Sequence, residues 1–217
     1  MDPMQDTTST RICLVRHGET AWNSERRVQG HIDIDLNAAG EAQARAAGRS
    51  LAAHSFAGVY SSDLQRAWRT AQIATAGLGL EVLPTPALRE RHFGVLQGIT
   101  SQEASEQEPH AHRHHLARTP DYDYETGESL LVFAARVMAG LEQLAARHAG
   151  RTVLAFTHGG VLDVAYRAAT GRPLEAPRDF PLPNAALNWI ERRNGAWRLI
   201  SWADSSHLQQ AMDELAG

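Results

Sequence analysis

The sequence predicts an α/β fold with a mainly parallel central sheet, and three observations support this. Short β-branched runs alternate with longer helical segments along most of the chain. Strands that are separated by helices pair in parallel through crossover connections. The chain has 217 residues and is 43% hydrophobic, which suits one substantial core better than two. We therefore expect a single domain over residues 11–217.

The first half of the chain contains three predicted strands, each apolar and short: 11–15, 57–62 and 80–88. Two helices are expected between them. The first covers residues 36–54, with Asn37 as its N-cap. The second begins near Ser62 or Asp63 and ends near Gly77 or Gly79.

The second half continues the alternation. A long helix over 127–150 is followed by a strand over 152–156 and a helix over 160–171, which Gly171 and Pro173 end. The last predicted elements are two strands within 186–203, joined at Asn194-Gly195, a strong hairpin signal that adds antiparallel pairing.

Two segments depart from this pattern. Residues 99–126 are polar, weakly patterned and rich in His, Glu and Gln, so we expect a lid-like excursion that covers a site. Residues 1–10 are polar and acidic, without the basic and apolar regions of a signal peptide, and are predicted to be disordered.

Composition excludes several classes of function. The net charge of −4 argues against a nucleic-acid partner, and no apolar run approaches the roughly 20 residues that span a membrane. Cys13 is the only cysteine, so no internal disulfide forms, which suits a cytoplasmic location. All 21 basic residues are arginine, so any side-chain cation that holds an anion is arginine or protonated histidine. The terminal hairpin suggests a possible homodimer.

Histidine and arginine gather at the predicted strand ends. The first strand ends in Arg16-His17-Gly18, and the strand over 152–156 runs into His158-Gly159-Gly160. Arg66 lies in the first turns of the helix after the strand over 57–62. Because the carboxyl ends of parallel strands form the ligand-binding edge of an open sheet, we expect these side chains to converge.

These residue types suit a phosphoryl group. Guanidinium groups match phosphate oxygens in a bidentate fork, and amides at glycines and helix N-termini favour an anion. A neutral imidazole accepts a phosphoryl group and then loses it to water, and the adjacent Arg16 charge opposes protonation of His17. The leaving alkoxide needs a proton, so a carboxylic acid is expected nearby.

The stretch "LVRHGETAWN" over 14–23 resembles the signature of the histidine phosphatase superfamily, the phosphoglycerate-mutase-like proteins. The resemblance continues in order through "VQGHIDIDLNAAGEAQA", "VYSSDLQRAWRTA", "LRERHFGVLQG", "GES" and "FTHGG", and is strongest to the short bacterial members. It implies a three-layer α/β/α sandwich and metal-independent hydrolysis of a small phosphorylated metabolite, without a cofactor.

The resemblance also implies residue roles. His17 would be the phosphorylated nucleophile, Arg16 and Arg66 would clamp the phosphoryl group, and His158 would bond its oxygens in the transition state. Glu90 would be the proton donor and acceptor. The candidate substrate-binding residues are Asn23, Gln29, Gly30, Gly159 and Arg113.

Two features offer rival interpretations. Glu19 is close to His17 in sequence and is an alternative acid, although its place in the turn favours a structural role. Within the cluster from His110 to His115, the pair His110 and His114 has zinc-ligand spacing but no acidic or cysteine partner. A solvated helix face is the favoured interpretation of the cluster, ahead of a substrate-facing lid.

Several activities stay open for a chain of this family. Mutases of the family carry a lysine and an arginine pair in the excursion and an asparagine after "HG", whereas this chain has no lysine, separated Arg113 and Arg118, and Gly160. These departures favour a phosphomonoesterase. The alternatives are a cofactor-dependent phosphoglycerate mutase, an α-ribazole-type phosphatase and a non-catalytic phospholigand-binding module.

Overall fold

The computed structural model describes residues 9–209. Six strands form the sheet: β1 Thr10–Arg16, β2 Val59–Ser61, β3 Val82–Pro84, β4 Thr152–Thr157, β5 Leu187–Arg193 and β6 Ala196–Asp204. The α-helices of this region are α1 Ala21–Ser24, α2 Ala38–Leu51, α3 Gln65–Thr75, α4 Ser101–Gln107, α5 Pro109–Leu116, α6 Leu130–Arg147 and α7 Gly159–Thr170. Two 3₁₀ turns, η1 Pro86–Leu88 and η2 Gly94–Leu96, follow β3.

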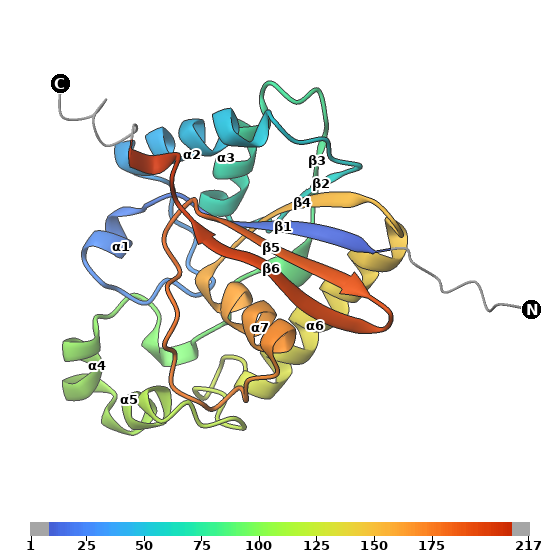
Figure 1. Cartoon of the computed structure of the whole chain (residues 1–217). Helices are drawn as coiled ribbons and strands as arrows, with labels where there is room; N and C mark the ends of the chain where they lie inside the picture. The colour runs from blue at the N-terminus through green and yellow to red at the C-terminus, as the bar shows by residue number, and fades with distance from the viewer. Residues whose placement is uncertain (1–8, 210–217) are drawn as a thin grey trace, which may run out of the picture.

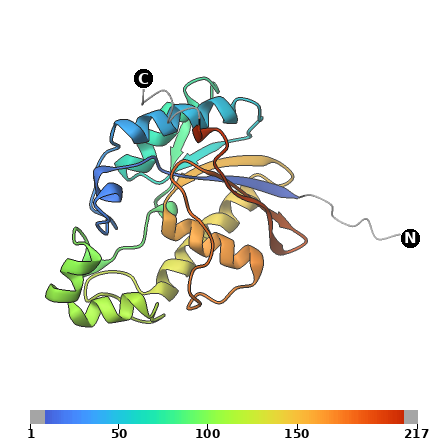
Figure 2. The same cartoon turned by 60° about the vertical axis from the view of Figure 1, so that its left-hand side comes forward.

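The sheet has the strand order β3-β2-β4-β1-β5-β6. β1, β2, β3 and β4 pair in parallel, while β5 is antiparallel to both β1 and β6. Helices α2 and α3 cover one face and α6 and α7 cover the other (Figures 1 and 2). The predicted α/β/α sandwich is therefore confirmed, and the hairpin adds antiparallel pairing as expected.

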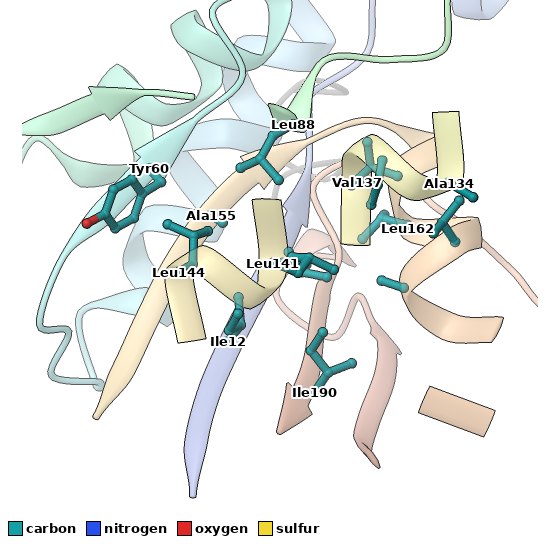
Figure 3. Packing of buried hydrophobic residues seen from close by; sticks show 14 of the residues in the cluster. Ile12, Tyr60, Leu88, Ala134, Val137, Leu141, Leu144, Ala155, Leu162 and Ile190 are labelled. Carbon is teal, nitrogen blue, oxygen red and sulfur yellow. The ribbon is translucent and has the colours of Figure 1, made fainter. Parts of the chain in front are cut away.

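The alternation of side chains along β1 joins the two cores. Ile12 and Leu14 pack into the cluster beneath α6 and α7, whereas Cys13 and Val15 pack into the cluster beneath α2 and α3. Figure 3 shows Leu141 of α6 among the sheet residues of the first cluster. Because both faces of β1 are covered from Ile12 to Val15, this part of the strand is apolar and fully buried.

The main predicted elements are present, with shorter bounds. Asn37 is the N-cap of α2, and its side chain accepts a hydrogen bond from the Gly40 amide at 2.8 Å. The third strand was predicted too long, because Pro84 and Pro86 lack the amide donors that a sheet needs and a 3₁₀ turn replaces the strand. Helix α3 begins at Gln65 rather than at Ser62 or Asp63.

The predicted excursion over 99–126 contains α4 and α5. They lie apart from the sheet (Figure 2) and pack on a small apolar cluster that includes Leu96, Ala104, Ala111 and Tyr124. A capping box at Thr100 begins α4, with the Glu103 side chain accepting from the Thr100 amide at 2.8 Å. The excursion is therefore built on its own satellite core.

The predicted disordered N-terminus lies outside the described residues except at Ser9 and Thr10. Thr10 is already the first residue of β1 and is paired with Arg192 of β5. The expectation of disorder is thus wrong at Thr10, because strand pairing with β5 extends the sheet by one residue. No helix within the region described, 9–209, is long and apolar enough to span a bilayer.

Candidate active site

His17 follows the last residue of β1 and is 3% exposed. Its amide donates to the Thr157 carbonyl at 2.8 Å, which continues the pairing of β1 with β4. Its ring Nδ1 lies 2.7 Å from the Gly18 carbonyl. Since a carbonyl only accepts, Nδ1 carries the proton, and the lone pair of a neutral His17 is on Nε2.

The surroundings of His17 keep the imidazole neutral. Burial lowers the pKa of His17 well below its ordinary value, and the charges of Arg66 and Arg16 lower it further. The Gly18 hydrogen bond acts in the opposite direction but is the smallest of these influences. His17 therefore keeps a free Nε2 lone pair at neutral pH, the form that a nucleophilic histidine requires.

A close approach between two glycines shapes the turn after His17. A Cβ on Gly18 would lie 2.4 Å from the Gly40 carbonyl oxygen, and a Cβ on Gly40 would lie 2.1 Å from the Glu19 carbonyl oxygen. The turn thus packs directly on the first turn of α2. Glu19 completes this junction, because its Oε1 accepts from Asn37 Nδ2 at 2.8 Å and Ser24 Oγ at 2.9 Å. These contacts support the structural interpretation of Glu19.

Two guanidinium groups, of buried Arg66 and half-buried Arg16, lie near His17 and are held by carbonyl oxygens. Arg66 donates to Gly30 O at 2.7 Å and to Ile32 O at 3.2 Å, and Arg16 donates to Leu182 O. The Nε atoms of both arginines are buried and have no hydrogen-bond partner among residues 9–209. Burial lowers the pKa of Arg66 to about 10 and lowers that of Arg16, while the charge of Glu90 counters both shifts. Two cations with unused donors therefore lie beside the neutral imidazole of His17.

His158 faces His17 from the N-terminus of α7. The two ring centroids are 5.2 Å apart, and His158 is fully buried. Its Nε2 lies 2.8 Å from Ser62 Oγ, and its Nδ1 is buried with no partner in the described part of the chain. Burial and then the Arg66 charge lower the pKa of His158 well below the ordinary value. Ser62, which directly follows β2, was not predicted as a site residue, although the stretch "VYSS" places it at the same sheet edge.

Glu90 meets the N-terminus of α7. Its Oε2 accepts from the Gly160 amide at 3.0 Å, and its Oε1 accepts from the Arg91 amide at 2.8 Å. A Cβ at position 160 would lie 2.1 Å from Glu90 Oε1, so the approach requires glycine there. The Glu90 carbonyl oxygen is fixed as well, by His31 Nε2 at 2.7 Å and Arg136 Nη2 at 3.1 Å.

A cavity of about 330 Å³ opens beside these groups. Its lining comprises Arg16, Glu90, Arg91, Phe93, His115, Arg118, Leu130, Phe133, Gly159, Gly160, Asp163 and Arg178. The predicted residues Arg16, Glu90 and Gly159 are thus brought to one cavity, whose far side is formed by the excursion and the segment after α7. This volume suits a small substrate.

The predicted substrate-binding residues take different places. Asn23 Oδ1 accepts from the Thr20 amide at 3.0 Å in the capping box of α1. Gln29 is 8% exposed, and its Oε1 is buried and finds no partner among the residues that the structure describes. Gly30 has a φ of +53° and presents its carbonyl to Arg66. Arg113 is exposed on α5 and is not among the residues that line the cavity.

The excursion supplies one arginine and one histidine to the cavity, and neither is the predicted substrate-binding residue Arg113. Arg118, beyond the end of α5, reaches inward to Asp163 Oδ2 at 2.6 Å. His115 lines the cavity and shares a hydrogen bond of 3.1 Å with Tyr124 Oη. Neither contact is visible in the sequence, because each depends on where the chain folds back after α5.

The rest of the histidine cluster is engaged in contacts within the excursion. His114 stacks on Tyr122 with ring centroids 4.2 Å apart, and His110 meets the same ring at 5.4 Å. His112 Nε2 lies 2.8 Å from Ser101 Oγ of α4. Over residues 9–209 there is no group of three or more metal-ligating side chains. His112 thus joins α5 to α4, while His110 and His114 hold the segment after α5 against that helix.

The fold and the site define a class of α/β enzyme in which histidine and arginine act on phosphorylated compounds. A family profile of the histidine phosphatase superfamily (branch 1) matches residues 12–205, and the chain belongs to this superfamily. The predicted resemblance and an enzyme of this kind are therefore confirmed.

Individual relatives carry both phosphatase and mutase-like names. The chain is 41% identical over 210 residues to the phosphoglycerate mutase-like protein 4 of Arabidopsis thaliana, covering 95% of this chain and 90% of the relative. It is also 41% identical to the metal-independent phosphoserine phosphatase of Arabidopsis thaliana, covering 95% and 87%. The solved structure of Bacillus stearothermophilus YhfR superposes with a TM-score of 0.86 at 33% identity, covering 92% and 99%.

Proposed function

We propose that the chain hydrolyses small phosphomonoesters through a phosphohistidine formed on His17. The observation that carries the proposal is the free Nε2 of a neutral His17 near Arg66 and Arg16, whose buried Nε atoms have no partner within residues 9–209. Buried donors without partners are costly unless a ligand uses them. A phosphoryl group supplies the anionic oxygens that these donors need.

The proposed reaction has two steps. His17 Nε2 attacks the phosphorus, the bond from phosphorus to the ester oxygen breaks, and Glu90 gives its proton to the leaving alcohol. Water then attacks the phosphohistidine, Glu90 takes a proton from that water, and inorganic phosphate leaves with His17 restored. Arg16, Arg66 and His158 stabilise the charge of the transferring group in both steps.

Hydrolysis is favoured over mutase activity by the arginines of the excursion. Arg118, one of the two, is bonded to Asp163, a carboxylate that Arg167 shares, and the other, Arg113, is exposed outside the cavity. The excursion therefore offers the cavity no arginine without a carboxylate partner that would retain a doubly charged substrate while water is excluded. Supplying 3-phosphoglycerate with catalytic 2,3-bisphosphoglycerate tests this, because isomerisation that outruns phosphate release by orders of magnitude would establish a mutase.

The nucleophile is tested by rapid quench with a labelled alkyl phosphomonoester. An acid-labile, base-stable phosphoprotein is expected in the parent chain and none in His17→Ala. Labelling that survives this substitution would place the nucleophile elsewhere, whereas turnover without any phosphoprotein would exclude the covalent mechanism.

Location and assembly remain predictions. Cys13 is a free, buried thiol, which is compatible with the reducing cytoplasm that we propose for the chain. A homodimer through the hairpin is proposed because β6 is an edge strand whose outer side is not paired within the sheet. Sedimentation at several protein concentrations would test the dimer.

A further inference from the structure

The polar side chains on the far side of the cavity are nearly all committed to partners inside the protein. Arg118 is paired with Asp163 and donates to Leu174 O at 2.9 Å. Asp163 is also bonded to Arg167 Nε at 3.0 Å. His115 is bonded to Tyr124 Oη. Each of these groups would have to break a hydrogen bond or ion pair inside the protein before it could bind a substrate, so none is free to recognise one.

Arg91 is committed in the same way. It is 5% exposed and donates to Glu128 O at 2.8 Å and to Tyr122 O at 3.1 Å. Its guanidinium carbon lies 4.6 Å from the centroid of the Tyr124 ring. These contacts hold Arg91 as a structural cation that joins the excursion to the segment bearing Glu90.

Arg178 is the exception. It lies in the segment between α7 and β5, which meets the excursion where Arg118 donates to Leu174 (Figure 1). It lines the cavity with an exposed side chain, and within residues 9–209 it has no hydrogen bond, ion pair or ring contact. A cation that faces a cavity without an internal partner is available to a ligand.

The charge of Arg178 reaches both ends of the cavity. Burial is the main cause of the lowered pKa of Arg16 and of His115, which falls to about 4, and the Arg178 charge lowers both further. Arg178 and Arg16 both line this one cavity of about 330 Å³, so a single small molecule can meet both. Between them the lining is partly apolar, with Phe93, Leu130 and Phe133.

We propose that Arg178 binds a carboxylate on the alcohol part of the substrate, so that the preferred substrates are small phosphorylated hydroxy acids. This rests on the proposed function, with the phosphoryl group at Arg16 and His17. A single free guanidinium matches a monoanion, and its fork fits the two carboxylate oxygens. A substrate with a cationic far end would instead meet Arg178 and Arg91 together, which opposes its binding.

Two compounds that differ only at the far end test the proposal. 3-Phosphoglycerate and glycerol 3-phosphate share the phosphorylated terminal carbon and its hydroxyl neighbour, but only the first carries a carboxylate. Their affinities are measured by calorimetry in the His17→Ala chain, so that turnover does not intervene. We expect 3-phosphoglycerate to bind about tenfold more tightly, and Arg178→Gln to remove most of this preference while leaving glycerol 3-phosphate unchanged.

Arg198→Gln is the matched control, because Arg198 is an exposed arginine on β6 at the edge of the sheet. It removes the same charge and is expected to leave the preference intact. Equal affinities for the two compounds, or an equal loss for both in Arg178→Gln, would overturn the proposal. Phosphate release from both compounds by the chain with His17 intact tests the proposed function separately, since a carboxylate preference without any hydrolysis would contradict only that function.

Discussion

Gly160→Ala is expected to separate catalysis from stability. The new Cβ would lie 2.1 Å from Glu90 Oε1, whereas ordinary contact begins at 3.4 Å, so the carboxylate has to retreat by about 1.3 Å. The atom in conflict is the end of a flexible side chain, and the next contacts, Glu90 Cδ and Phe133 Cζ, are both at 3.1 Å. The clash is therefore relieved by moving Glu90 rather than by deforming the helix.

Gly160→Ala is expected to affect stability and catalysis in opposite directions. Alanine is favoured over glycine within a helix by roughly 0.5–1 kcal/mol, and Gly160 is in the first turn of α7. The free energy of unfolding should thus be unchanged or slightly higher. A displacement of about 1 Å in a proton donor costs on the order of 10²-fold in rate. We expect that loss in kcat for alkyl phosphates, and a much smaller loss for p-nitrophenyl phosphate, whose leaving group needs no proton.

The assay is steady-state phosphate release combined with urea unfolding. Gly77→Ala is the matched control, because a Cβ at Gly77 meets nothing within 4 Å. In a Glu90→Gln background, Gly160→Ala should cost little further rate, since both changes act through one carboxylate. Full alkyl phosphatase activity in Gly160→Ala, or fully additive losses in the double variant, would refute the role of Gly160 as the residue that positions Glu90.

Further changes address the other groups of the site. Glu90→Gln should slow alkyl phosphates on the order of 10²-fold more than aryl phosphates, and equal slowing would count against a general acid. Arg66→Lys should lose on the order of 10²-fold in kcat, because an ammonium lacks the fork; near-normal turnover would contradict the clamp. The pKa values of His17, His158 and His115 are lower in the folded state than in the unfolded state. The unfolded state therefore binds more protons as the pH falls through about 6.5. Each of these histidines then lowers the free energy of unfolding by up to about 1.4 kcal/mol per pH unit. Urea unfolding at pH 7.5 and 5.5 measures this, and equal stabilities would contradict buried neutral histidines.

The sequence predicts well the parts of the site that depend on strand order. Arg16 is the last residue of β1 and His17 follows it, while His158 follows β4, the parallel neighbour of β1. Because the carboxyl ends of parallel strands meet at one edge of the sheet, these three residues come together. The same alternation predicts α2 with its Asn37 cap and the long helix α6. These features follow from local pattern and from the pairing of adjacent strands.

Contacts between segments that are distant in the sequence cannot be predicted from such local patterns. Arg118 has a φ of +50°, and this reversal after α5 carries it to Asp163, 45 positions away, while Arg113 stays on the exposed face of α5. Asn184 donates to the His17 carbonyl at 2.9 Å from the irregular segment before β5, where no periodicity marks it. The sequence does contain a signal for the start of helix α4, because Thr100 and Glu103 have capping-box spacing.

The way the arginines are held explains how a chain without lysine prepares a site for an anion. Arg66 is bonded to the carbonyls of Gly30 and Ile32, and Arg16 to that of Leu182, so dipoles fix both guanidinium groups without cancelling their charge. A carboxylate in the same place would reduce their positive charge, as Asp163 does for Arg118 and Arg167. Burial without a counter-ion is unfavourable, and this is why the pKa of Arg66 falls to about 10. We therefore expect a bound phosphoryl group to offset this cost of burial, most strongly in the transition state, where negative charge develops on its oxygens.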